Sequence, residues 1–257
     1  MLDPGSERFS GRPRRFVLSL SAAVLDAARQ LSRDISGLSF PDPVTHVYNP
    51  LDYAWEPHGE YLRRYADSRK RVLMLGMNPG PWGMVQTGVP FGEVAAVRDW
   101  LGISSPIGEP RLQHPKRPVT GLSCTRSEVS GRRLWGLFAE RFGSAEAFFV
   151  DHMVTNYCPL AFMEQSGRNH TPDKMPADAT EELFAACDRH LERIVELLEP
   201  RWLIGVGGFA EKKLQSVFAG SDYLVGRVLH PSPASPAANK GWAEAAVAQL
   251  ESQGVWP

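Results

Sequence analysis

Two short apolar runs in this chain each end in a loop rich in glycine and proline, and this pattern most constrains the fold. The run Arg71–Leu75 leads into Gly76–Met84, and the run Leu224–Leu229 leads into His230. Apolar runs of this length are typical of buried strands in a parallel sheet. Ligands of open α/β sheets bind beyond the carboxyl ends of such strands. We therefore expect Asn78 and His230 to meet at one edge of a sheet.

Strand-like and helix-like segments alternate along the rest of the chain. Two further strands are expected over Ala147–Val154 and Trp202–Val206. Helices are expected over residues 16–35, 54–65, 93–101, 132–142, 179–198, 208–218 and 241–250. The stretch Phe40–Leu51 holds three prolines, and we expect it to be irregular. This alternation predicts an α/β fold with a parallel sheet covered by helices on both faces.

Length and composition favour one soluble globular domain. The chain has 257 residues, of which 43% are hydrophobic and 22% charged, and no linker interrupts it. We expect one domain over 15–257 after a disordered polar tail over 1–14. No apolar run approaches the roughly 18 residues of a membrane span, so no membrane partner is expected. Three cysteines without metal-type spacing favour a reduced, intracellular compartment and predict no metal site.

Asn78 and His230 are the candidate catalytic residues. An Asn amide can hold or polarise a water, but it cannot remove a proton as a carboxylate can. A neutral His can donate a hydrogen bond to negative charge that develops on a leaving group. For each residue a purely structural role, in a turn or a cap, remains an alternative.

Two further residues are candidates for recognising a base. Asn156 begins the sequence Asn-Tyr-Cys-Pro-Leu after the second expected strand. Its amide offers both a donor and an acceptor, which fits the imide edge of a nucleobase. Phe91 could stack on a base face. Asn156 could equally satisfy its own loop, and Phe91 could belong to the core.

A local excess of positive charge follows the first loop. With a net charge of −1 the whole protein has no general attraction to nucleic acid. The segment 111–133 nevertheless contains only one acidic residue, Glu128, and these basic residues: Arg111, Lys116, Arg117, Arg126, Arg132 and Arg133. Basic loops of this kind fit phosphate contacts, although a solvated surface is the simpler interpretation.

Three motifs together resemble the single-strand-selective monofunctional uracil-DNA glycosylases, within the uracil-DNA glycosylase superfamily. They are the segment from Gly76 to Val94, Asn-Tyr-Cys-Pro-Leu from Asn156, and His-Pro-Ser-Pro from His230 with Ala-Asn-Lys-Gly-Trp from Ala238. The resemblance covers residues from about Phe40 to Trp242. It implies a three-layer α/β/α sandwich around a four-stranded parallel sheet, and removal of uracil and 5-substituted uracils, such as 5-hydroxymethyluracil, from DNA.

The resemblance also implies a role for each candidate residue. Asn78 would position the attacking water, and His230 would stabilise the departing uracil anion. Phe91 would stack on the base, and Asn156 would read its edge. The substrate-binding residues implied are Met77, Gly80, Met84, Phe91 and Asn156. Small Gly80 and pliable Met84, in place of a rigid aromatic, would leave room for a substituent at C5.

The loop after His230 would be a wedge that enters the duplex where the base leaves. The resemblance assigns this role to Pro231, Ser232, Pro233, Ala234, Ser235 and Pro236. The family commonly carries an Arg where this chain has Ala234, which puts strong duplex binding and product retention in doubt.

The partner expected from the resemblance is single- or double-stranded DNA that contains uracil or a modified uracil. We expect a monomer without a cofactor, in the nucleus of a eukaryote or in the cytoplasm and nucleoid of a prokaryote. The first two motifs hold no lysine for an amine nucleophile, so strand cleavage is not expected. Alternatives are a glycosylase of the same fold that prefers hypoxanthine or xanthine, and a non-catalytic nucleic-acid-binding protein.

Overall fold

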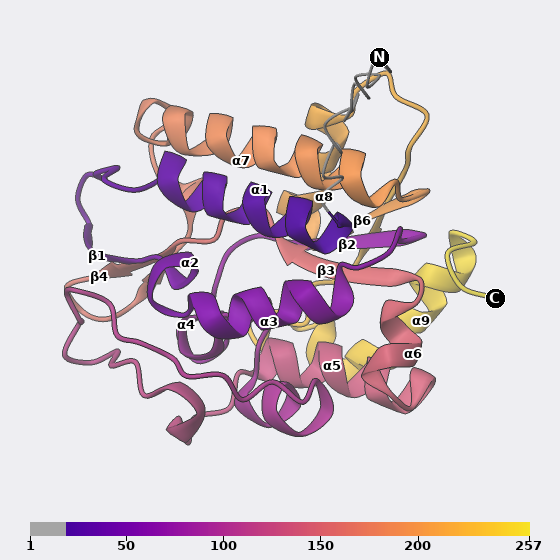
Figure 1. Ribbon diagram of the computed structural model, residues 1–257, viewed down its shortest axis with the longest axis horizontal. Coiled ribbons are helices and arrows are strands. Elements are labelled where there is room, and N and C mark those ends of the chain that lie inside the picture. The colour runs from indigo at the N-terminus through magenta and orange to yellow at the C-terminus, as the bar shows by residue number, and fades with distance from the viewer. Residues whose placement is uncertain (1–18) are drawn as a thin grey trace, which may run out of the picture.

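The computed structural model describes residues 19–257 and is built around a four-stranded parallel sheet (Figure 1). The strand order is β3-β2-β6-β7, so that β2 and β6 lie in the middle. The strands are β2 Val72–Gly76, β3 His152–Asn156, β6 Trp202–Val206 and β7 Leu224–Val228. Every residue of β2 is buried, as expected for a strand covered on both faces.

Helices cover both faces of this sheet, which confirms the expected three-layer α/β/α fold. In Figure 1, α1, α7 and α8 lie above the sheet, and α5, α6 and α9 lie below it. The helices are α1 Leu20–Asp34, α2 Pro50–Tyr53, α3 Trp55–Tyr65, α4 Met84–Thr87, α5 Val129–Phe142, α6 Ala145–Phe149, α7 Ala177–Leu198, α8 Gly208–Val217 and α9 Trp242–Ser252.

The register of the sheet places the carboxyl ends of its strands side by side. Gly76, the last residue of β2, lies opposite Asn156, the last residue of β3. On the other side of β2, Leu75 lies opposite Gly205 of β6. Val206 of β6 in turn lies opposite Val228 of β7. The loops that follow these strands therefore start at one edge of the sheet.

A second, antiparallel sheet corrects the expectation of an irregular segment over Phe40–Leu51. Val44–Tyr48 forms β1, which pairs with β4 Ala161–Glu164, and β4 also pairs with β5 Asn169–His170. The pattern of prolines hid β1, because its partner strand lies more than a hundred residues later. Asn49 and Pro50 follow β1 directly, where they cap and begin α2.

The expected strand over Ala147–Val154 was wrong in its first half. The residues before His152 form the short helix α6, whose Ser144 hydroxyl accepts a hydrogen bond from the Ala147 N–H at 3.2 Å. Phe148 and Phe149 are buried from this helix. A short apolar run does not by itself distinguish a strand from a buried helical turn.

The remaining helices agree with the expected ranges to within a few residues. The expected helix over 93–101 is helical from Val94 and takes a π-helical turn over Ala96–Trp100. The expected tail over 1–14 and the first residues of the expected helix over 16–35 lie outside the described residues. The assignment of 15–257 to a single domain stays a prediction.

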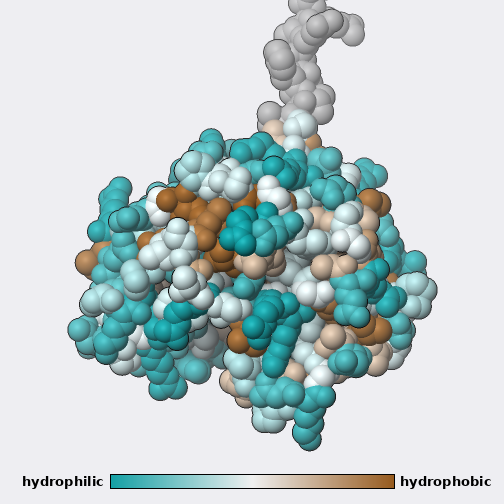
Figure 2. Space-filling view, turned by 90° about the horizontal axis from the view of Figure 1, so that it is seen from below, coloured by the Kyte–Doolittle hydropathy of each residue, from teal (hydrophilic) through white to brown (hydrophobic). Residues whose placement is uncertain are grey.

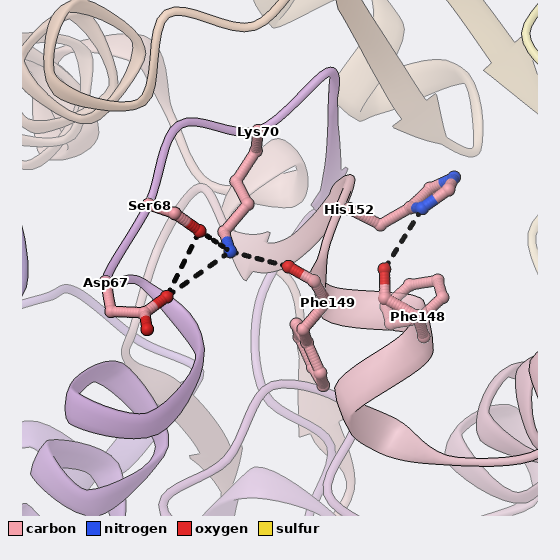
Figure 3. Close-up of polar contacts among 6 residues, drawn as sticks. All are labelled: Asp67, Ser68, Lys70, Phe148, Phe149 and His152. Atoms are coloured by element: carbon pink, nitrogen blue, oxygen red, sulfur yellow. Dashed lines mark hydrogen bonds and ion pairs between the residues drawn. The ribbon is translucent and has the colours of Figure 1, made fainter.

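A buried lysine links the amino ends of the strands, at the edge of the sheet opposite the loops described above (Figure 3). The Lys70 side chain donates hydrogen bonds to the Ser68 hydroxyl at 2.9 Å and to the Phe149 carbonyl at 2.5 Å. Asp67 lies 3.8 Å from the same ammonium. Because Phe149 ends α6, the cation lies at the negative end of that helix. This network fixes α6 against the start of β2.

The surface carries few exposed apolar side chains. Figure 2 shows the lower face, where teal hydrophilic residues predominate and brown apolar residues form small groups. In residues 19–257 the large hydrophobic side chains that are exposed are Val47, Leu112, Val150 and Leu224. None of the helices in this part of the chain is long and apolar enough to cross a membrane.

Candidate active site

A cavity of about 390 Å³ opens at the carboxyl ends of the parallel strands. The segment after β2, the end of β3 and the loop after β7 all contribute to its wall, so Asn78 and His230 line one cavity. Most of the residues expected at the site lie in this wall: Met77, Asn78, Gly80, Met84, Phe91, Asn156, His230, Ser232 and Pro233. Four residues of the expected wedge lie outside the lining: Pro231, Ala234, Ser235 and Pro236.

The loop after β2 is held by the loop after β3. The Tyr157 N–H donates to the Gly76 carbonyl, and the Cys158 N–H donates to the Met77 carbonyl, both at 2.9 Å. The Asn78 side chain then donates from Nδ2 to the Leu160 carbonyl at 3.1 Å. This bond fixes the amide and leaves its Oδ1 available as an acceptor, the group that can orient a water molecule.

Asn156 lies at the base of the cavity, where only 7% of its surface is exposed. Its Nδ2 lies 3.3 Å from the Met84 sulfur, a weak contact that leaves most of its hydrogen-bonding capacity available. Gly76 makes room for this side chain. A Cβ at position 76 would collide with Asn156 Oδ1 and with the Phe91 ring.

The Phe91 backbone has a conformation that is rare for a bulky residue, with φ at 53°. The Phe91 carbonyl accepts a hydrogen bond from Trp135 Nε1 at 3.1 Å, which stabilises this conformation. The ring lines the cavity, with its centroid 6.1 Å from that of His230. An aromatic ring held in this way can stack against a planar ligand.

His230 is held in one tautomer by its own loop. Its Nδ1 accepts a hydrogen bond from the Ser232 N–H at 3.1 Å, so the ring proton of the neutral form is on Nε2. Burial lowers the pKa of the His230 imidazole below its usual 6.5. At neutral pH the side chain is therefore an uncharged Nε2–H donor on the wall of the cavity.

The expected wedge is braced from α5. The Arg133 guanidinium donates to the Pro231 carbonyl at 3.0 Å and to Asn239 Oδ1 at 2.9 Å. Asn239 in turn donates from Nδ2 to the Pro233 carbonyl at 2.9 Å. Within the loop, the Ala234 N–H donates to the Ser232 hydroxyl at 3.1 Å. The segment is thus a stiff structure at the mouth of the cavity.

Sequence analysis missed several polar residues of the cavity. Glu128, noted there only for its charge, lines the cavity and caps α5 by accepting from the Gly131 N–H at 2.5 Å. Burial raises the pKa of its carboxyl group. Ser130, Asn169 and Thr171 also face the cavity, together with Pro79 and Pro81.

Asn169 and Thr171 belong to the antiparallel sheet that the sequence did not reveal. They lie two positions apart around β5, so alternation directs both side chains to the same side. Asn169 Oδ1 is buried and has no hydrogen-bond partner among the described residues. A buried acceptor at a cavity wall is suited to a donor supplied by a ligand or a water. In the sequence, the only feature that could have indicated these two cavity residues is that they lie two positions apart, as Asn-x-Thr.

Nothing in the described part of the chain groups three His, Cys, Asp or Glu side chains as metal ligands. Besides the Glu128 carboxyl group, the cavity offers neutral amides, a neutral imidazole, hydroxyl groups and an aromatic ring. Such groups can bind a planar polar base and stabilise a leaving anion without accepting a full proton.

Comparisons with known proteins identify the family of this chain. A family model for the uracil DNA glycosylase superfamily matches residues 63–251. The single-strand selective monofunctional uracil-DNA glycosylase of Rattus norvegicus is 49% identical over 256 residues, which cover 99% of this chain and 92% of that protein. The Mus musculus protein of the same description is 50% identical over 241 residues, 93% of this chain and 86% of that protein.

A solved structure shares the fold at much lower sequence identity. The crystal structure of wild-type SMUG2 from Pedobacter heparinus matches with a TM-score of 0.67 and 18% identity, over 93% of this chain and 100% of that one. At this sequence identity, the likeness shows a shared arrangement of helices and strands. Together with the family match over residues 63–251, these findings show that the chain belongs to the uracil DNA glycosylase superfamily.

Proposed function

We propose that this protein is a monofunctional DNA N-glycosylase that removes uracil during base excision repair. One observation carries the proposal: the fixed amide of Asn78 and the neutral imidazole of His230 line the same cavity. Relatives described as single-strand selective monofunctional uracil-DNA glycosylases support it. Removal of 5-substituted uracils such as 5-hydroxymethyluracil, and activity on both single and double strands, belong to the same proposal.

The reaction begins once the target nucleotide has left the base stack and its base has entered the cavity. The C1′–N1 bond breaks, and its electron pair leaves with the uracil, which becomes an anion. The Nε2–H of His230 donates a hydrogen bond to that anion through O2. A water that donates a hydrogen bond to Asn78 Oδ1 attacks C1′ and then loses a proton to solvent. The uracil anion takes up one proton from solvent, so the products are uracil and an abasic site.

Asn78 acts by positioning the attacking water, because a neutral amide is too weak a base to take the proton of that water. The departure of the base leaves an oxocarbenium-like sugar, which a neutral water can attack. None of the described residues in the cavity wall is a lysine. A covalent amine intermediate, and the strand cleavage that follows it, are therefore not part of the proposed mechanism.

The rest of the wall would select the base. The Phe91 ring stacks on its face, and the buried Asn156 amide offers a donor and an acceptor to the imide edge. Gly80 and Met84 line the cavity without a rigid aromatic side chain. Met is adaptable, so this part of the wall can accept a substituent at C5.

The test is a panel of oligonucleotides that contain uracil, 5-hydroxymethyluracil, hypoxanthine or xanthine, in single and double strands. We expect release of the uracils, with strand breaks only after alkali treatment. His230→Ala should slow release by about 100- to 1,000-fold, because it removes one donor to the developing anion, worth ~3–4 kcal/mol. A folded wild-type protein that forms no abasic sites would overturn the proposal. Release of purines alone would favour the hypoxanthine or xanthine alternative, and binding without base release would favour the non-catalytic one.

A further inference from the structure

Two arginines contact the half-buried part of the first loop, beside the cavity. Trp82 follows Pro81, which lines the cavity, and the Trp82 side chain is half-buried. The guanidinium carbon of Arg117 lies 5.0 Å from the Trp82 ring centroid, and that of Arg126 lies 4.7 Å from it. We call these three side chains the Trp82 cluster. Cation–π contacts at these distances restrain long side chains that would otherwise move freely.

No carboxylate of residues 19–257 forms an ion pair with the arginines of the Trp82 cluster. Across residues 19–257, neither Arg117 nor Arg126 forms an ion pair with a carboxylate, whereas many other arginines do. Glu128 is the single acidic residue of segment 111–133, and its carboxylate is buried at the start of α5. Two cationic groups are therefore fixed beside the cavity without a counterion.

Arg117 also retains unused donor capacity. One of its terminal nitrogens donates to the Lys116 carbonyl at 3.2 Å, while its Nε is buried without a hydrogen-bond partner in the described part of the chain. An unpartnered buried donor is uncommon in a folded protein. The second terminal nitrogen of Arg117 makes no hydrogen bond with the described residues, and arginine binds phosphate through such N–H groups.

The proposed reaction places phosphates near these groups. An extruded nucleotide remains bonded to its 5′ and 3′ phosphates, which stay at the mouth of the cavity while the base is inside. The loop after His230 forms one side of that mouth, through Ser232 and Pro233. The Trp82 cluster adjoins the wall formed by Pro81 and Gly80. The strand that carries the target base must leave the cavity past one of these walls.

We propose that the Trp82 cluster binds backbone phosphates of the DNA strand that carries the extruded nucleotide, with Trp82 holding Arg117 and Arg126 in place. This proposal rests on the proposed function and extends it to a second group of residues. Phosphate contacts carry no sequence information, and they set the register of the strand. The subsite therefore supports binding of single-stranded DNA without a base-specific contact.

The test measures binding rather than base release. The probe is a fluorescein-labelled single-stranded oligonucleotide with a tetrahydrofuran abasic analogue, titrated by anisotropy between about 50 and 200 mM salt. Arg117→Ala and Arg126→Ala should each reduce the slope of log affinity against log salt by about 0.7, the effect of one lost contact to single-stranded DNA. Trp82→Ala should weaken binding although both charges remain, while Trp82→Phe should bind like the wild type.

Arg201→Ala is the matched control. Arg201 is exposed and directly precedes β6, at the opposite edge of the sheet from the cavity. Arg201→Ala changes the net charge by the same amount as Arg117→Ala or Arg126→Ala. It should leave the slope of log affinity against log salt unchanged. Equal losses in Arg201→Ala and Arg126→Ala would overturn the proposal, because the effect would then be one of general charge. An unchanged slope in a folded Arg117→Ala/Arg126→Ala double variant would also overturn it. Because the probe carries no base at the tetrahydrofuran position and no uracil elsewhere, these outcomes are independent of whether the wild type releases uracil.

Discussion

At the scale of single residues, the site depends on the absence of a side chain at Gly76 as much as on the side chains that line it. Gly76 ends β2 at the point where the end of β3 and the Phe91 ring come together. The Asn156 amide and the Phe91 ring occupy the volume that a Cβ at position 76 would fill. Glycine is therefore required there by close packing against two residues proposed to hold the base.

We expect Gly76→Ala to displace Asn156 or Phe91 and to lower base release by at least about 100-fold. The added methyl group overpacks the base of the cavity, at a cost of about 1–3 kcal/mol in stability. Single-turnover kinetics and thermal unfolding measure the two effects separately. Gly136→Ala in α5 is the control, because a Cβ there meets no atom within 4 Å. That change should leave release unaffected and raise stability by up to about 1 kcal/mol. Normal release by Gly76→Ala would contradict the proposed role of this packing.

At the scale of elements, α5 supports the loop after β7. The two hydrogen bonds of Arg133 and the bond from Asn239 to Pro233 hold this loop against the helix. The neighbouring Arg132 is exposed, and its side chain makes no hydrogen bond or ion pair with the described residues. Substitution of each arginine in turn therefore separates the effect of the hydrogen bonds made by Arg133 from the effect of losing one positive charge.

Arg133→Ala should reduce the ratio of double-strand to single-strand activity by about tenfold. The substitution removes both hydrogen bonds of Arg133, and a tenfold change in the ratio corresponds to about 1.4 kcal/mol, less than two charge-assisted bonds contribute together. A loosened wedge affects entry into a duplex, whereas a single strand presents its base without such entry. Arg132→Ala should leave the ratio unchanged in parallel assays on both substrates. Equal effects of the two substitutions on both substrates would show that the brace does not serve the wedge.

The elements also show where sequence reasoning succeeded and where it could not. The strands β2, β6 and β7 were predictable because each is a short apolar run followed by a distinctive loop, as at Gly76 and His230, whereas the start of β3 was predicted five residues too early. The antiparallel sheet was not, because β1 and β4 are short and far apart in sequence, so neither shows a local signal of the pairing. Because this sheet was not predicted, Asn169 and Thr171 were not recognised as cavity residues. The hydrogen bond between the Ser232 N–H and His230 Nδ1 likewise has no sequence signal, because it depends on the path of the loop in space.

At the scale of the whole molecule, two buried histidines and the half-buried His190 couple folding to pH. Burial lowers the pKa of His58, His152 and His190 from 6.5 to about 4. His152 is a clear case, because its Nε2 accepts a hydrogen bond from Trp256 and is therefore unprotonated. Its Nδ1 lies 3.2 Å from the Phe148 carbonyl, to which it donates (Figure 3). The folded protein thus holds these rings neutral at pH values where the unfolded chain would protonate them.

The free energy of unfolding should therefore fall as the pH drops from about 6.5 towards about 4. In that window the unfolded chain binds more protons than the folded one, by up to about 1.4 kcal/mol per pH unit for each histidine. Urea unfolding at several pH values between about 7.5 and 5 measures this dependence. His152→Gln should flatten it, because one of the contributing groups is removed. A midpoint that does not change with pH would show that these rings are protonated in the folded state.

The bond between His230 Nδ1 and the Ser232 N–H has a consequence for acid conditions. Once the imidazole takes up a second proton, Nδ1 becomes a donor that faces another donor, and this turn of the loop loses its anchor. Acidification would thus release the ring from its own loop, so the Nε2–H donor and the neighbouring segment would lose their fixed positions in a single event. Chemistry and strand entry would be affected together, because one imidazole contacts the leaving group through Nε2–H and the loop through Nδ1.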